Sequence, residues 1–257
     1  MVLKNYSPIV EFSESFQNDL EARILNAKKP GVRALAAFDA DGTLWDTDIG
    51  EIFFLYQIKN CQLANMPADP WKHYIDLKEI DRIKAYYWLA QINVGKKLSQ
   101  VQDWAADAIR DFGEVPILKS NQHLIQFLKK NGVEVFVVTA SVKWAVEPAA
   151  ALVGVDRDHV IGIETEVQNG VVSDRPVFPA TYRQGKAEAI LKATGGVAPL
   201  LSVGNTVGDI ALLNCSAGVK LAVRTQPKAD KNNQLLEDEL ALENEAKVHG
   251  WLSHGFR

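Results

Sequence analysis

Short apolar segments that each end in a polar turn alternate along this chain with segments of helical periodicity. The clearest apolar segments cover residues 34–39, 132–141, 198–205 and 218–223. A short apolar run is typical of a strand that is buried on both faces, and such strands alternate with helices in parallel sheets. The pattern therefore predicts an α/β fold that is built on a Rossmann-like, doubly wound parallel sheet.

The stretch between the first two of these strands differs in character. It contains no convincing strand, and its three helical patterns cover residues 49–60, 81–94 and 98–112. We therefore expect a helical cap at residues 47–112, inserted into a core domain that is formed by residues 1–46 and 113–257.

Three further elements complete the expected fold. Residues 13–27 carry apolar side chains at helical spacing, which predicts a helix that packs on the outside of the core. An Asn-Gly pair between β-branched side chains within residues 159–173 indicates a strand and a small hairpin at one edge of the sheet. Residues 228–250 are highly charged, which predicts a surface helix with a partly frayed tail.

Charge and composition narrow the possible partners. The chain has 257 residues and a formal net charge of -4, and no run of lysine or arginine exceeds two residues. A nucleic acid is therefore not an expected partner, because its phosphate backbone needs a basic surface. No apolar stretch has the length of a membrane span or a signal peptide, so we expect a cytoplasmic protein without a membrane partner. The sequence leaves the oligomeric state open.

The two cysteines, Cys61 and Cys215, lie far apart in the sequence. They lack the spacing of a zinc site or a redox pair. We interpret them as packing thiols in a reducing compartment.

Polar side chains follow three of the predicted strands. These segments are Asp39-Ala40-Asp41-Gly42-Thr43, Thr139-Ala140-Ser141 and residues 204–209 (GNTVGD). In an open parallel sheet the carboxyl ends of the strands border the binding crevice, so we expect the three segments to converge. Each residue alone has a simpler explanation as a turn former, a helix cap or a surface charge, and it is the convergence that favours a functional site.

Aspartates clustered in such a crevice repel one another unless a hard cation joins them. Asp39, Asp41 and Asp209 therefore indicate a bound cation. Magnesium (Mg2+) is the expected cofactor because it prefers a few carboxylate ligands together with a substrate phosphate. Lys186 opens a predicted helix and would offset the charge of that phosphate.

The polar segments also occur in a familiar order. FDADGTLW, VVTAS, GKAEAI and GNTVGD resemble, in this order, the four sequence motifs of the haloacid dehalogenase (HAD) superfamily. The helical insertion after the first motif resembles the cap of the phosphoserine phosphatase-like branch. The resemblance implies a magnesium-dependent hydrolase of small phosphate monoesters that works through an aspartyl phosphate.

Carried over to this sequence, the resemblance implies a role for each matched residue. Asp39 is the expected nucleophile, and Asp41 is the expected acid for the leaving group and then the base for the attacking water. The expected phosphate-binding residues are Gly42, Thr43, Thr139 and Lys186. The expected Mg2+ ligands are Asp39, Asp41 through its backbone carbonyl, Asn205 and Asp209. Many relatives carry an aspartate in place of Asn205, so we expect weaker Mg2+ binding here.

The substrate is less constrained. Asp48 lies where phosphoserine phosphatases carry an acidic residue for the substrate amine, and it is also placed to cap a helix that begins at Ile49. The cap arginine expected for a serine carboxylate is absent from YYWLAQINVG, and the nearest basic residues are Arg82 and Lys84. We expect phosphoserine or a related amino-alcohol phosphate. The alternatives are phosphocholine, phosphoethanolamine and a catalytically idle phosphate-binding module.

The predicted cap is rich in aromatic residues, among them Trp71, Tyr74 and Trp88. Such residues can form a cage for a quaternary ammonium group by cation–π attraction. They can equally form the core of a small helical cap. The sequence alone leaves both interpretations open.

Overall fold

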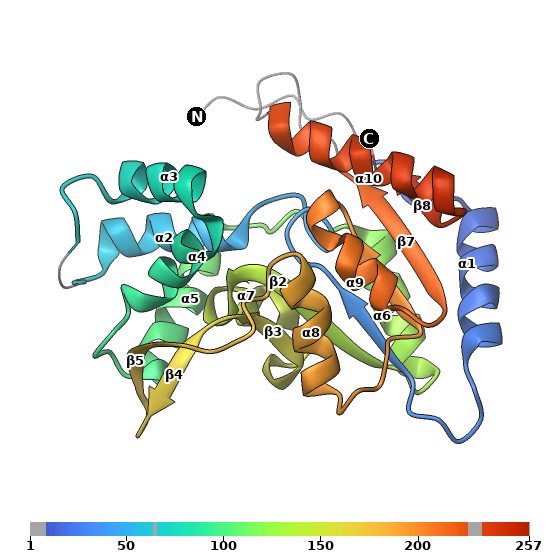
Figure 1. The fold of residues 1–257 in the computed structure, drawn as a ribbon, viewed down its shortest axis with the longest axis horizontal. Helices are drawn as coiled ribbons and strands as arrows, with labels where there is room; N and C mark the ends of the chain where they lie inside the picture. Colours follow the sequence, from blue (N-terminus) through green and yellow to red (C-terminus); the bar gives the residue numbers. More distant parts are fainter. Residues whose placement is uncertain (1–8, 64–65, 226–232, 257) are drawn as a thin grey trace.

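The computed structural model describes residues 9–63, 66–225 and 233–256 (Figure 1). Its helices are α1 (Glu14–Ala27), α2 (Ile49–Asn60), α3 (Pro70–Ile80), α4 (Arg82–Gln91), α5 (Leu98–Phe112), α6 (Lys119–Lys130), α7 (Lys143–Leu152), α8 (Gln184–Ala193), α9 (Ile210–Cys215) and α10 (Asn233–His249). Its strands are β1 (Leu35–Phe38), β2 (Glu134–Val142), β3 (Val160–Ile163), β4 (Thr165–Gln168), β5 (Val171–Pro176), β6 (Leu201–Gly204), β7 (Val219–Arg224) and β8 (Leu252–Gly255).

Six strands form one parallel sheet in the order β3-β2-β1-β6-β7-β8. The chain builds this sheet outwards from β1 in both directions, so the strand order reverses between β1 and β6. A ligand crevice is expected outside the carboxyl ends of the strands at such a point. The predicted parallel α/β sheet is confirmed. The predicted edge strand is β3, and the hairpin that follows it forms a separate antiparallel pair, β4-β5.

Helices cover both faces of the sheet because successive strand residues point to opposite faces. Ala36 and Phe38 of β1 face a buried cluster that includes side chains of α1, α6 and α7. Leu35 and Ala37 face the other way, toward α8 and α9. Each fully buried side chain of the size of Phe38 contributes roughly 1.5–3 kcal/mol to folding, so the two clusters hold β1 rigidly in the centre.

Helices α2, α3, α4 and α5 lie to one side of the sheet, between β1 and β2 in the chain (Figure 1). The helical insertion after the first strand is thus where the sequence predicts it, but α3 was not expected. Asp69 caps α3 through its side chain, and Pro70 stands at the first helical position, where a missing N–H costs nothing. The core of the insertion also includes Trp144 of α7 and Val172 of the hairpin, so the insertion packs directly on the rest of the chain.

The C-terminal segment differs from its prediction as a frayed surface helix. Leu242 and Ala246 of α10 are buried against Ala222 of β7, so one side of the helix belongs to the core. The chain then adds β8 in parallel register beside β7. The LSHG sequence of β8 has no apolar run, and its pairing therefore depends on the free edge that β7 offers. Residues 226–232, which include the start of the predicted surface helix, lie outside the described residues.

Both cysteines are free and half-buried. Burial raises the pKa of the Cys61 thiol to about 11, so this thiol stays protonated at neutral pH. Within the described ranges, no helix has both the length and the apolar character needed to cross a membrane.

Candidate active site

A cavity of about 200 Å³ opens where β1, β2 and β6 end. Phe38 pairs with Val137 of β2 and with Val203 of β6, so the residues that follow these strands meet at one edge of the sheet. Seven of the predicted site residues line this cavity: Asp39, Asp41, Asp48, Thr139, Lys186, Asn205 and Asp209. The predicted convergence of the polar segments is therefore confirmed.

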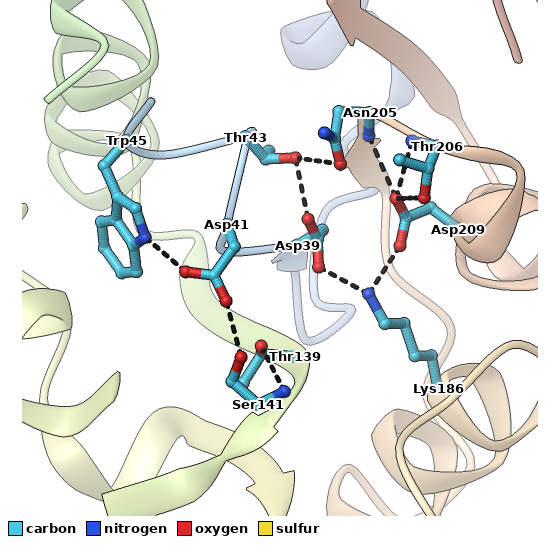
Figure 2. Close-up of polar contacts among 10 residues, drawn as sticks. All are labelled: Asp39, Asp41, Thr43, Trp45, Thr139, Ser141, Lys186, Asn205, Thr206 and Asp209. Carbon is cyan, nitrogen blue, oxygen red and sulfur yellow. Dashed lines mark hydrogen bonds and ion pairs between the residues drawn. The ribbon is translucent and has the colours of Figure 1, made fainter. Parts of the chain in front are cut away.

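Asp39 lies at the centre of the site and is 5% exposed. Its Oδ1 accepts a hydrogen bond from Lys186 Nζ at 2.5 Å, and its Oδ2 accepts one from Thr43 Oγ1 at 3.0 Å (Figure 2). Burial and the nearby Asp209 raise the pKa of Asp39 to about 7, although Lys186 opposes the shift. A carboxylate kept this basic in a dry site is a better nucleophile than an exposed one.

Lys186 bridges two carboxylates. Its Nζ donates to Asp39 Oδ1 and, at 2.6 Å, to Asp209 Oδ1 (Figure 2). Burial lowers the pKa of Lys186, but Asp209 and Asp39 outweigh it and raise the pKa above the ordinary value of lysine. The ammonium group therefore keeps its proton and lies beside the Asp39 carboxylate as a fixed positive charge.

Asp41 is held by three donors. Its Oδ1 accepts from Trp45 Nε1 at 2.7 Å and from the backbone N–H of Ile49 at 2.9 Å, and its Oδ2 accepts from Ser141 Oγ at 2.7 Å. Burial raises the pKa of Asp41, and these hydrogen bonds oppose the rise. Trp45, the last residue of FDADGTLW, was not predicted as a site residue, although its indole N–H needs a partner once it is buried.

Asp209 orients the loop after β6. Its Oδ2 accepts from the backbone N–H groups of Asn205 and Thr206 at 3.1 and 3.0 Å. A Cβ on Gly204 would stand 2.4 Å from Asp209 Cβ, so only glycine permits this close approach. With Oδ1 on Lys186, both oxygens of Asp209 have donors, and they fix the loop and the lysine.

Gly42 and Thr43, which the sequence predicts as phosphate-binding residues, do not line the cavity. The tight turn after β1 directs the Gly42 N–H to the carbonyl of Trp45 at 2.9 Å. Gly42 has φ +79°, and a Cβ there would lie 2.1 Å from Asn205 Nδ2. Thr43 Oγ1 lies 3.4 Å from Asn205 Oδ1. Both residues therefore shape the surroundings of Asn205.

Asp48 lines the cavity and also caps α2. Its Oδ1 accepts from the backbone N–H of Glu51 at 2.8 Å, as the capping interpretation requires. Burial, Asp41 and Glu51 together raise the pKa of Asp48 well above its usual range. Asp48 therefore stabilises α2 through a hydrogen bond, while its negative charge, when ionised, destabilises the folded state.

These two properties of Asp48 are separable by substitution. Asp48→Asn keeps a capping oxygen, whereas Asp48→Ala removes it and should lower the free energy of unfolding by about 1 kcal/mol. Because the folded-state pKa of Asp48 is raised, its contribution to stability is present below the ordinary aspartate pKa and is lost as pH rises through the raised value. Asp48→Asn should therefore gain stability over the wild type as pH rises above the ordinary aspartate pKa. Urea unfolding at several pH values checks this, and a difference that is constant with pH would contradict it.

The far end of the cavity is lined by the helical insertion. Lys78 and Arg82 bring positive charge there, together with Tyr74 and Tyr86. Lys78 Nζ lies 3.1 Å from a carboxylate oxygen of Glu51 and 5.1 Å from the centre of the Tyr74 ring. Arg82 was expected only as a nearby basic residue, and Lys78 was not predicted because α3, which carries it, was not predicted.

The other aromatic residues of the insertion pack on one another. The Phe54 ring lies 6.1 Å from the Trp71 ring and 5.5 Å from the Trp88 ring, and none of the three lines the cavity. They form the core of the insertion. The core interpretation of these aromatic residues is therefore the one that agrees with the structure.

The donors available to a metal ion are mixed. The described residues hold no group of three or more histidine, cysteine, aspartate or glutamate side chains placed to bind a metal. A carboxylate oxygen and an amide oxygen nevertheless lie near one hydroxyl group: Asp39 Oδ2 is 3.0 Å and Asn205 Oδ1 is 3.4 Å from Thr43 Oγ1. An oxygen set that includes a carboxylate and an amide suits a hard cation such as Mg2+.

Three solved structures share this fold. A protein of unknown function from Bordetella pertussis Tohama I is 20% identical with a TM-score of 0.66, covering 86% of this chain and 98% of that chain. A functionally unknown protein from Anaerococcus prevotii DSM 20548 is 17% identical with a TM-score of 0.66, covering 98% of this chain and 94% of that chain. A HAD family hydrolase from Salmonella enterica serovar Typhi is 12% identical with a TM-score of 0.53, covering 84% of this chain and 73% of that chain.

The sequence itself places the chain in a family. A comparison with curated proteins gave no match. The family described as haloacid dehalogenase-like hydrolase (HAD) matches residues 36–214, which include both aspartates of the first motif, Lys186 and the loop after β6. The chain therefore belongs to the haloacid dehalogenase-like hydrolase family.

Proposed function

We propose that this protein is a Mg2+-dependent phosphomonoesterase in which Asp39 attacks the phosphorus atom. The observation that carries the proposal is the arrangement of Asp39 between the ammonium group of Lys186 and the oxygen donors Thr43 and Asn205. A basic carboxylate with a fixed cation on one side and room for a metal on the other suits attack on a phosphate dianion.

The metal would be held by Asp39 Oδ2, Asn205 Oδ1 and the backbone carbonyl of Asp41. Asp209, predicted from the sequence as a further ligand, would instead act by orienting Lys186 and the loop, since its oxygens already accept from them. When bound, Mg2+ would neutralise the carboxylates and polarise the phosphoryl group.

In the first step an oxygen of Asp39 forms a bond to phosphorus while the ester oxygen departs. Asp41 gives its proton to that oxygen, and the product alcohol leaves. Water then attacks the aspartyl phosphate, Asp41 accepts a proton from it, and the Asp39 carboxylate is released with inorganic phosphate. Lys186 and Thr139, which both line the cavity, would hold the phosphoryl oxygens during both steps.

The role of Asp41 predicts a dependence on the leaving group. Asp41→Asn keeps acceptors and donors near Trp45 and Ser141 but cannot supply the proton. The variant should lose about 10²–10⁴-fold in kcat/KM on alkyl phosphates and much less on p-nitrophenyl phosphate, whose leaving group needs no proton. Steady-state kinetics on both substrates check this, because kcat/KM reports the steps up to departure of the leaving group, and equal losses in kcat/KM on the two would contradict the acid role.

The cavity lining supports a small polar leaving group with charges of both signs. Asp48 and Glu51 offer partners for an amine, and Lys78 and Arg82 offer partners for an anion. Phosphoserine or a related amino-alcohol phosphate is therefore our proposed substrate, and Asp48 remains its predicted amine contact. Phosphocholine is less suited, because Lys78 already stands over the Tyr74 ring.

We further propose that residues 47–112 act as a cap over a core domain formed by residues 1–46 and 113–257. The position of the insertion after β1 supports the phosphoserine phosphatase-like branch of the family. Nucleic acid and membrane are not proposed as partners, and a cytoplasmic location remains a prediction.

A panel of phosphomonoesters assayed with Mg2+ and with a chelator tests the proposed function. Hydrolysis of p-nitrophenyl phosphate that stops on chelation and returns with Mg2+ is the expected result. A protein that binds phosphate but releases none from any ester would instead be the idle module. Phosphoserine, phosphoethanolamine and phosphocholine in the same panel rank the leaving groups.

A further inference from the structure

Glu239 reaches the candidate metal site from outside the segment that matches the family. It belongs to α10, beyond residues 36–214, and it is 1% exposed. Its Oε1 lies 3.3 Å from Asn205 Nδ2, 3.3 Å from the backbone N of Thr225 and 3.0 Å from Thr225 Oγ1. One buried carboxylate oxygen thus accepts from the loop after β6 and from the end of β7.

These contacts decide which end of the Asn205 amide faces the site. An asparagine amide has a donor end and an acceptor end, and it can turn so that they exchange places. Glu239 Oε1 accepts, so the amide must direct its NH2 group to α10. Its Oδ1 then points to the opposite side, toward Thr43 Oγ1, which also donates to Asp39. A reversed amide would present hydrogen atoms where a cation is expected.

We propose that Glu239 is a positioning residue that holds Asn205 Oδ1 in place as a ligand for the cation. This inference rests on the proposed function, because it assumes the Mg2+ site. Glu239 and Asn205 form a pair. Asn205 stands where many relatives carry an aspartate in the fourth motif, and the Glu239 carboxylate of α10 lies beside it. The fit is tight, since Gly42 packs against Asn205 Nδ2 and leaves the amide little room.

The pair explains why an aspartate would not simply improve this site. In Asn205→Asp the donor that faces Glu239 Oε1 at 3.3 Å becomes a second acceptor, so two buried carboxylates meet without a proton between them. Glu239→Gln restores a donor in that background. In the wild-type background Glu239→Gln removes the negative charge of Glu239. Asn205 Nδ2 already donates there, so the added donor has no acceptor to satisfy.

Direct Mg2+ titration by calorimetry tests the proposal without relying on turnover. Glu239→Ala should raise the Kd for Mg2+ about 10-fold or more, as loss of a group behind a metal ligand commonly does. Thr225→Val is the matched control: it removes another hydrogen bond to Glu239 Oε1 but leaves the one to Asn205, so its Kd should equal that of the wild type. Thermal unfolding without metal reports the structural cost of each variant.

The second arm is independent of the alanine variant. Glu239→Gln should tighten Mg2+ binding in the Asn205→Asp background and leave it unchanged or weaker in the wild-type background. An equal effect in both backgrounds, or an unchanged Kd in a folded Glu239→Ala variant, overturns the positioning role. If the wild type hydrolyses esters but the Kd for Mg2+ does not change when Glu239 is replaced, only the positioning role of Glu239 is wrong. If the wild type neither binds Mg2+ nor hydrolyses esters, the proposed function is wrong as well.

Discussion

Asp39→Asn is expected to abolish turnover, with kcat lowered by a factor on the order of 10⁴ or more. An amide is not a nucleophile at neutral pH, and it brings a donor into a position where Asp39 now accepts from both Lys186 and Thr43. The fold should survive, since the substitution preserves the volume of the side chain. The measurement is phosphate release from p-nitrophenyl phosphate at saturating Mg2+.

A matched control for Asp39→Asn is Asp76→Asn. Asp76 is an exposed carboxylate of α3 that forms an ion pair with Lys72, and it does not line the cavity. The activity of the Asp76→Asn variant should equal that of the wild type. Substantial residual turnover in pure Asp39→Asn protein, with substrate affinity intact, would remove Asp39 from the role of nucleophile.

Lys186→Met is expected to cost the most stability, about 3–5 kcal/mol in the free energy of unfolding without metal. Lys186 is 4% exposed and is the cation between Asp39 and Asp209, so its loss leaves two buried carboxylates facing each other. The folded-state pKa of Asp39 should rise further, because Lys186 no longer opposes the shift. Such a group contributes stability below the ordinary aspartate pKa and loses it as pH rises, so the deficit should be larger at about pH 8 than at about pH 5.

Lys72→Met is the control for that loss. Lys72 forms an ion pair with Asp76 at 2.6 Å, but both side chains are more than half exposed, so water screens the pair and its loss should change the free energy of unfolding little. Urea unfolding of Lys186→Met and Lys72→Met at about pH 5 and about pH 8 compares the stability loss at the buried bridge with the loss at the surface pair. Equal losses for Lys186→Met and Lys72→Met would show that the Lys186 bridge contributes no more than a surface pair.

The sheet and the centre of the site were predictable because both depend on local sequence. Apolar runs such as residues 34–39 mark buried strands, and polar groups at their ends meet by the geometry of parallel sheets. By contrast, α3 and β8 were missed. Helix α3 carries Trp71, Tyr74 and Ile75 at helical spacing, and this signal was overlooked. Strand β8 forms on the edge of β7, which no pattern within LSHG reveals.

The finer contacts of the site escaped prediction because they cross long stretches of chain. Gly42 and Thr43 belong to a recognisable motif, yet the turn after β1 directs them to Asn205 and away from the cavity. Glu239 sits in a charged helix whose sequence resembles a surface helix, and only packing on β7 shows its buried side. Tertiary neighbours of this kind carry no signal in the spacing of one sequence.

The most direct test of the central claim is to trap the phosphorylated enzyme. Asp41→Asn protein, mixed with p-nitrophenyl phosphate and Mg2+, should accumulate the aspartyl phosphate, since the variant lacks the base for its hydrolysis. Acid quenching and peptide mass spectrometry should find the mass of one phosphoryl group on the peptide that contains Asp39, and none when a chelator is present. Continued hydrolysis with no phosphoryl group on Asp39, or with one on a different residue, would contradict the account.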